Sequence, residues 1–219
     1  MSFTKNAPKD MLGRYSVRGS YRLVATTGAV TTIAARTATA GQLFTVRYPT
    51  AATAAHMYLR YLGARFTLTT AYGTAQETGC DLILARSYTV NGTNGTAVDL
   101  GSTVTTTNKY DPGFPASLIT AGCCRIADTA AITAGTHTLN ANPVGAVTAW
   151  SAAIGDQVPL GTSGAGGGFG VLFDARDDGY PIKITADQGF VCRNMPVMGA
   201  TGVGHWDFCM IWDEGFPES

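Results

Sequence analysis

Three carboxylates stand close together in the segment Asp174-Ala-Arg-Asp-Asp-Gly-Tyr180. Asp174, Asp177 and Asp178 supply oxygen atoms, which are the ligands that calcium prefers. Their spacing does not match the calcium loop D-x-[DN]-x-[DN]-G, and Asp-Asp-Gly is a common turn sequence. The segment is therefore predicted to form a turn, and calcium binding there is left open as the alternative.

The segment from Gly161 to Gly170 has the glycine content of a phosphate-binding loop. It fits neither G-x-G-x-x-G nor G-x-x-x-x-G-K-[ST]. A phosphate cradle also needs the amino end of a helix, whereas strand-forming residues follow this segment. We expect a flexible surface loop.

Residue patterns of known catalytic sites are missing from the chain. It contains no G-x-S-x-G and no H-E-x-x-H, and only three glutamates. His137 falls in an expected turn, while His56 and His205 each begin an expected strand, so no two histidines are predicted to meet. We expect a protein that is not an enzyme, with no catalytic residue, no cofactor and no metal ligand.

The five cysteines form no C-x-x-C pair, which indicates neither a zinc site nor a secreted disulfide framework. Cys123 and Cys124 are adjacent, so their side chains point to opposite faces of a strand. Cys192 and Cys209 are predicted to face each other on a hairpin of strands 190–193 and 206–212. A one-residue change of register would separate them.

Composition indicates which elements must position these residues. Ala, Thr and Gly account for 89 of 219 residues, while Lys and Glu together number seven. Long surface helices are normally covered with Lys and Glu, whereas Thr, Val, Ile and aromatic residues favour strands. The sequence therefore predicts an all-β protein.

Segments with strand character recur at short intervals, separated by turn sequences such as Asn91-Gly92 and Asn94-Gly95. The expected strands are 15–25, 43–48, 57–70, 82–90, 123–126, 169–173, 182–185, 190–193 and 206–212. The Ala/Thr-rich stretch 127–153 is interpreted as loops laid along a sheet. The pattern fits a single-domain sandwich or a jelly-roll-like barrel with long loops, and an immunoglobulin-like sandwich and a closed barrel stay open.

The last expected strand has the clearest alternation. Trp206, Phe208, Met210 and Trp212 fall on one face by the period of two, with Asp207 and Asp213 among the residues of the other face. This strand is expected to form a large part of the core. Its tryptophans are interpreted as packing residues, with a stacking platform for sugar or base as the alternative.

No change in composition marks a linker, so one domain is expected over residues 14–214. Residues 1–13 are polar and are predicted to be an N-terminal arm that orders on a partner. Residues 215–219 are assigned to a C-terminal tail.

The charge pattern limits the expected partners. The net charge is zero and the basic residues are scattered, which argues against nucleic-acid binding. No secretory signal is recognisable, and no stretch approaches the ~20 apolar residues of a membrane span. We expect synthesis and folding in a cytoplasm, no membrane association, and burial of the sparsely charged surface in a homo-oligomer.

Several segments resemble a family of tailed-bacteriophage virion proteins. The resemblance spans roughly residues 30–214 and rests on sequence habits with no catalytic signature. The segments that carry it are IAARTATA (33–40), FTLTTAYGTAQE (66–77), RIADTAAITAGTHTL (125–139), QGFVCRN (188–194) and WDE (212–214).

The resemblance implies a structural role in a virion that is assembled in the host cytoplasm. We expect a capsid decoration or cement protein that bridges major capsid protein subunits or other virion proteins. The alternative is a neck, tail or fibre component, including a receptor-binding module for host glycan. Exposure of Tyr72, Tyr110, Phe114 or Tyr180 would favour glycan binding.

Overall fold

The computed structural model describes residues 15–50, 54–98, 100, 107–120, 122–151, 153–154, 157–158 and 168–217. Their strands form two antiparallel sheets, and their one helix is the four-residue α2 (Ala175–Asp178). The chain is an all-β sandwich and not a closed barrel, which confirms the predicted fold class. The described residues contain no helix that is long and apolar enough to span a membrane. The predicted arm 1–13 and residues 161–167 of the glycine-rich segment lie outside the described residues.

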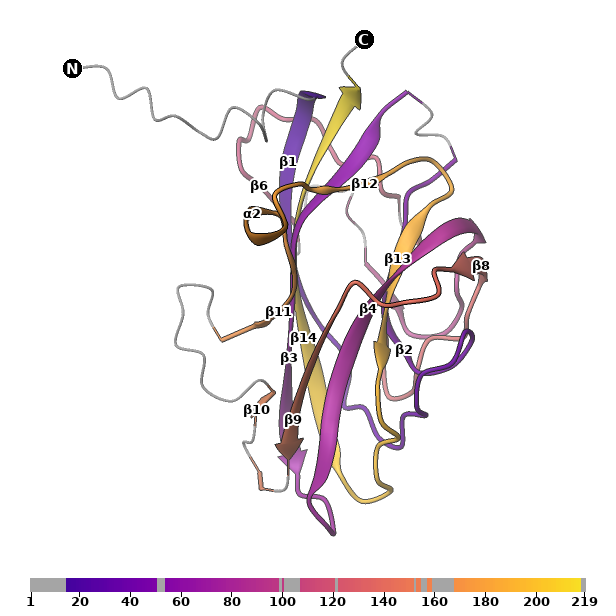
Figure 1. Ribbon diagram of the computed structural model, residues 1–219, viewed down its shortest axis with the longest axis vertical. Helices are drawn as coiled ribbons and strands as arrows, with labels where there is room; N and C mark the ends of the chain where they lie inside the picture. Colours follow the sequence, from indigo (N-terminus) through magenta and orange to yellow (C-terminus); the bar gives the residue numbers. More distant parts are fainter. Residues whose placement is uncertain are drawn as a thin grey trace, which may run out of the picture.

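Each sheet has seven strands. Sheet A consists of β1 (Tyr15–Thr26), β3 (His56–Thr70), β6 (Thr107–Lys109), β10 (Gln157–Val158), β11 (Gly170–Asp174), β12 (Ile182–Ile184) and β14 (Val203–Pro217). Sheet B consists of β2 (Gln42–Arg47), β4 (Gln76–Val90), β5 (Thr96–Ala97), β7 (Cys124–Ile126), β8 (Thr136–Leu139), β9 (Gly145–Ser151) and β13 (Gly189–Asn194). Figure 1 shows the two sheets lying against each other.

The strands pair in a nested order. β1 pairs with β14, β2 with β13, β3 with β12, and β4 with β9, all antiparallel. Successive pairs alternate between sheet A and sheet B. An antiparallel ribbon rolled up in this way is a jelly roll, so the structure selects this topology from those that the sequence left open.

A long insertion, residues 91–135, separates β4 from β8. It contributes β6, which pairs with β1, and β7, which pairs with β2. The insertion therefore extends one edge of each sheet. Extra strands of this kind protect sheet edges that would otherwise expose unpaired backbone groups.

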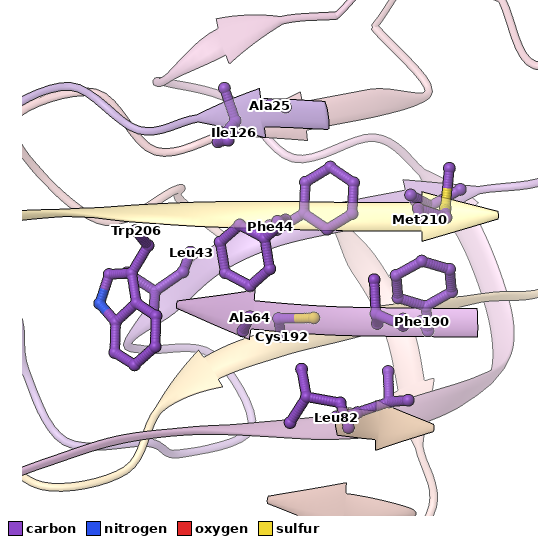
Figure 2. Close-up of a cluster of buried hydrophobic side chains, with 14 of the residues drawn as sticks. Ala25, Leu43, Phe44, Ala64, Leu82, Ile126, Phe190, Cys192, Trp206 and Met210 are labelled. Atoms are coloured by element: carbon purple, nitrogen blue, oxygen red, sulfur yellow. The ribbon is translucent and has the colours of Figure 1, made fainter. Parts of the chain in front are cut away.

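The core lies between the sheets and is built by residues from both. Figure 2 shows Phe44 of β2 and Phe190 of β13 among side chains from sheet A such as Trp206 and Met210. Phe44 also stacks on Phe208 of β14, with ring centroids 5.1 Å apart. Aromatic pairs at this distance add to the hydrophobic stabilisation of the core.

The alternation predicted for β14 is confirmed. Its inward face consists of Trp206, Phe208, Met210 and Trp212, all fully buried. Trp212 stacks on Tyr21 of β1 with ring centroids 5.3 Å apart. β14 is the central strand of sheet A and pairs with β1 on one side and with β3 on the other. Trp206 and Trp212 are therefore packing residues.

The predicted hairpin of strands 190–193 and 206–212 is wrong. β13 belongs to sheet B and β14 to sheet A, so Cys192 and Cys209 do not lie opposite each other. Residues 195–202 cross between the sheets, and hydrogen bonds join this connection to residues 33–34. Asn194 Nδ2 donates to the carbonyl of Ile33 at 3.3 Å, and the Met198 amide donates to the same carbonyl at 2.9 Å.

Two further expectations need correction. The stretch 127–153 is not only loops, because it contains β8 and β9, which both pair with β4. β14 continues to Pro217, so residues 215–217, expected in the C-terminal tail, pair with β1. Thr26 ends β1 at the far end of the same ladder, opposite Asp207.

Candidate functional site

Glu214, near the C-terminal end of β14, is a deeply buried glutamate with no exposed surface. Ser117 Oγ donates to its Oε1 at 2.5 Å, and the Leu118 amide donates to the same oxygen at 2.9 Å. Arg18 Nη1 donates to Oε2 at 2.8 Å. The carboxylate thus joins β14 to β1 and to the insertion 91–135.

A β-bulge in β1 positions the arginine of this cluster. The register with β14 shifts between Val17 and Gly19, so Arg18 is the extra residue. Bulges redirect a side chain in this way. A Cβ at Gly19 would lie 2.3 Å from the hydroxyl oxygen of Tyr21, so glycine leaves room for this ring.

Burial dominates the electrostatics around Glu214. It raises the pKa of the Glu214 carboxyl, while the donors from Ser117, Leu118 and Arg18 oppose the rise. Burial, together with the negative charge of Glu214, raises the pKa of Tyr21 to about 12. The same two causes raise the pKa of Tyr48. Such perturbed groups mark candidate active sites, and a carboxyl with a raised pKa is a candidate general acid.

The contacts of Glu214 argue against catalysis. Both of its oxygens accept hydrogen bonds from the covering segment around Ser117 and Leu118. The same segment is held by Tyr21, whose hydroxyl donates to the carbonyl of Pro115 at 3.0 Å. A buried carboxylate whose two oxygens both accept hydrogen bonds from the protein serves to hold the structure together.

A second buried carboxylate lies on the outer face of sheet B. Asp81 of β4 has no exposed surface and binds two arginines. Arg193 of β13 donates to it at 3.1 and 2.7 Å, and Arg36 donates at 2.7 Å. Arg193 also donates to the carbonyl of Thr37 at 3.2 Å, so this cluster holds residues 36–37 on the sheet.

The outer face of sheet A carries two similar groups. Asp207 accepts from Thr26 at 2.6 Å and from Arg65 at 2.7 Å. Asp213 accepts from Ser20 at 2.5 Å and lies 3.4 Å from an Arg60 nitrogen. Each group spans β1, β14 and β3, so the carboxylates fasten neighbouring strands to one another.

The carboxylates singled out in the sequence have a local role. Asp174 is the N-cap of α2, where it accepts from the Arg176 amide at 2.9 Å, and it forms an ion pair with the Arg176 side chain. The predicted turn is thus a short helix closed by Gly179. Asp177 and Asp178 are exposed. Within the described ranges no group of His, Cys, Asp and Glu side chains could hold a metal ion.

The histidines lie apart. His56 is the first residue of β3. His205 of β14 lies opposite Thr67, near the other end of β3. His137 is in β8 of sheet B. His137 Nε2 contacts the Gln42 amide at 3.2 Å. Burial lowers the pKa values of His56 and His137. The geometry brings no two of them together.

Exposed aromatic rings are present. Tyr110 is 58% exposed and Tyr180 53%, while Phe114 is half-buried and Tyr72 is buried. No sequence-based expectation covered Trp150 of β9, which is the most exposed of the described aromatic residues at 67%. The exposed large apolar side chains of the described residues are Val24, Val90, Tyr110, Val144, Trp150, Ile154, Val171, Tyr180, Val197 and Phe216.

Comparison with protein-family models, with curated proteins and with solved structures finds no match to this chain.

Proposed function

We propose that this chain is a structural protein of a tailed-bacteriophage virion, and specifically a capsid decoration or cement protein. It bridges major capsid protein subunits, stabilises the shell through buried interface and catalyses no reaction. The location of its charges carries the proposal.

Several of the carboxylates are buried within the subunit, where they pair with arginines. Five of the acidic residues that the structure describes are buried. They are Asp81, Asp174, Asp207, Asp213 and Glu214, and each is paired with arginine. These carboxylates therefore add little charge to the exterior, and ten large apolar side chains of the described residues remain exposed on it. The centres of protein interfaces are depleted in charged residues in the same way.

Two other observations agree with a role in assembly. The jelly roll is a fold of viral capsid domains, although it also serves lectins and enzymes, so this support is at the level of the fold alone. The resemblance to phage virion proteins points in the same direction. A homo-oligomer placed in the virion during assembly in the host cytoplasm fits both.

Copy number in purified phage particles tests the proposal. Quantitative mass spectrometry against the major capsid protein should find the chain in hundreds of copies, as a shell position with high symmetry requires. A small ring of copies would instead support the alternative of a neck, tail or fibre component, which the exposed rings of Tyr110 and Tyr180 favour as a glycan-binding module. Absence from particles would reject both.

A further inference from the structure

A strip of exposed side chains runs along β9 and β4 on the outer face of sheet B. Trp150 lies directly opposite Glu77, and Thr148 lies directly opposite Gly79. The side chains of Trp150, Glu77 and Thr148 are exposed. Directly opposed residues point to the same face of a sheet. Glu77 is in no ion pair among the described residues. The two strands run side by side in Figure 1.

The strip ends at the Asp81 cluster. Ala146 is opposite Asp81, so the cluster continues the same face by the period of two. The side chain of Arg36 there is 36% exposed, and Asp81 fixes one side of its guanidinium. Asp81 follows Glu77 by four residue steps along β4, or about 13 Å. This length suits a short oligosaccharide better than a single sugar.

We propose that this strip, formed by Trp150, Glu77, Thr148 and Arg36, is a binding site for a neutral oligosaccharide. The ring of Trp150 stacks on the apolar face of one sugar ring. The Glu77 carboxylate accepts hydrogen bonds from sugar hydroxyls, and the free edge of the Arg36 guanidinium donates to them.

The surroundings of Trp150 favour a glycan over a protein partner. A tryptophan at the centre of a protein interface lies among side chains that exclude water from it. Among the described residues of β9 and β4, its neighbours on the same face are Glu77, Thr148 and Gly79, which place a carboxylate and a hydroxyl beside the exposed ring. The proposal holds for a shell subunit and for a tail subunit alike, so its failure would leave the proposed virion role untouched.

The three tryptophans make the test direct, because Trp206 and Trp212 are fully buried and Trp150 is exposed. Quenching of fluorescence by acrylamide should therefore report on Trp150. Cellotetraose, maltotetraose and chitotetraose are the probes. At least one of them should protect Trp150 from quenching in a saturable manner, and calorimetry should give the same affinity.

Variants locate the binding. Trp150→Ala should weaken binding by about tenfold or more in calorimetry, the effect of losing one stacking ring. Glu77→Gln should weaken it several-fold. Val197→Ala, which removes an exposed apolar side chain elsewhere, is the matched control and should bind like the wild type. Circular dichroism should show that all three variants are folded.

Three results would overturn the proposal. They are the absence of saturable binding for all three probes, equal affinity of Trp150→Ala and the wild type, and protection of Trp150 that depends on protein concentration without sugar. The last result, checked by sedimentation, would assign the strip to contact between copies of the chain.

Discussion

The two faces of β14 differ in how they bury polar groups. The inward face is apolar, with Trp206 and Phe208 fully buried in the core. The outward face carries Asp207 and Asp213, which are almost as inaccessible, yet each is satisfied by a hydroxyl and an arginine from neighbouring strands. Apolar packing therefore stabilises the inside of the sandwich, whereas ion pairs and hydrogen bonds join neighbouring strands on its outer face.

The largest effect is expected inside. Phe208→Ala should lower the free energy of unfolding by about 3 to 5 kcal/mol, because it removes a buried ring and leaves a cavity beside Phe44. Urea denaturation measures the change. Val24→Ala, on the exposed face of β1, is the control and should stay within about 0.5 kcal/mol. A loss below about 1 kcal/mol for Phe208→Ala would contradict its role in the core.

Asp81→Ala should be nearly as destabilising, although Asp81 lies on an outer face. The substitution leaves Arg193 buried without its carboxylate, and breaking a buried ion pair typically costs about 3 kcal/mol or more. Asp178→Ala, at an exposed carboxylate, should have little effect. Equal urea midpoints for the two variants would show that the outer charges do not stabilise the sheet.

Glu214 is the charged exception on the inside, and its effect should depend on pH. Burial raises its pKa in the folded state, so its contribution to stability is fully present below the unfolded pKa and is lost as pH rises through the folded pKa. The stability of the wild type relative to Glu214→Gln should therefore fall as pH rises from 4, by at most about 1.4 kcal/mol per pH unit. Urea denaturation between pH 4 and 7 measures it. A rise with pH would mean that the pair with Arg18 outweighs burial.

A smaller effect is expected from one hydroxyl of the outer face. Thr26→Ala removes the donor at 2.6 Å from Asp207, while Arg65 still holds the carboxylate. The loss should be about 1 kcal/mol, typical of a single hydrogen bond. Thr70→Ala, at an exposed strand position, corrects for the loss of strand propensity. Thermal unfolding of the two variants should separate them by several degrees.

Deleting residues 1–13 should change stability least, because the paired part of β1 remains and its ladder with β14 begins at Tyr15. The truncated protein should unfold at the same urea concentration as the full chain. It should nevertheless fail to enter phage particles if these residues are the predicted arm. Normal incorporation would reject that role.

The sequence predicted the strands that carry large side chains. In β14 the apolar residues alternate strongly enough to mark both the strand and its buried face, whereas for β3 the residue types marked the strand alone. β9 was missed because its inward residues, Val147, Ala149 and Ser151, are small and only partly apolar. The alternation was present there, and the outward Trp150 was the one signal of an exposed face.

Relations between distant segments could not be predicted. Nothing in residues 189–194 or 203–217 indicates that they join different sheets, and so the proximity of Cys192 and Cys209 was inferred wrongly. Arg36, Asp81 and Arg193 come from three separate parts of the chain, so no spacing announces their cluster. Glu214 likewise meets Ser117 only because the insertion folds back over the end of the core.

Tyr15 and Pro217 are direct partners in the ladder of β1 and β14, two strands that lie side by side in Figure 1. A short linker between these two residues would therefore join them without distorting the sheet, and the chain could be opened elsewhere. The exposed turn at Asn94 and Gly95 is a suitable place for new termini. A circular permutant made in this way should keep every strand pair of the jelly roll while moving both free ends to the edge that the insertion extends.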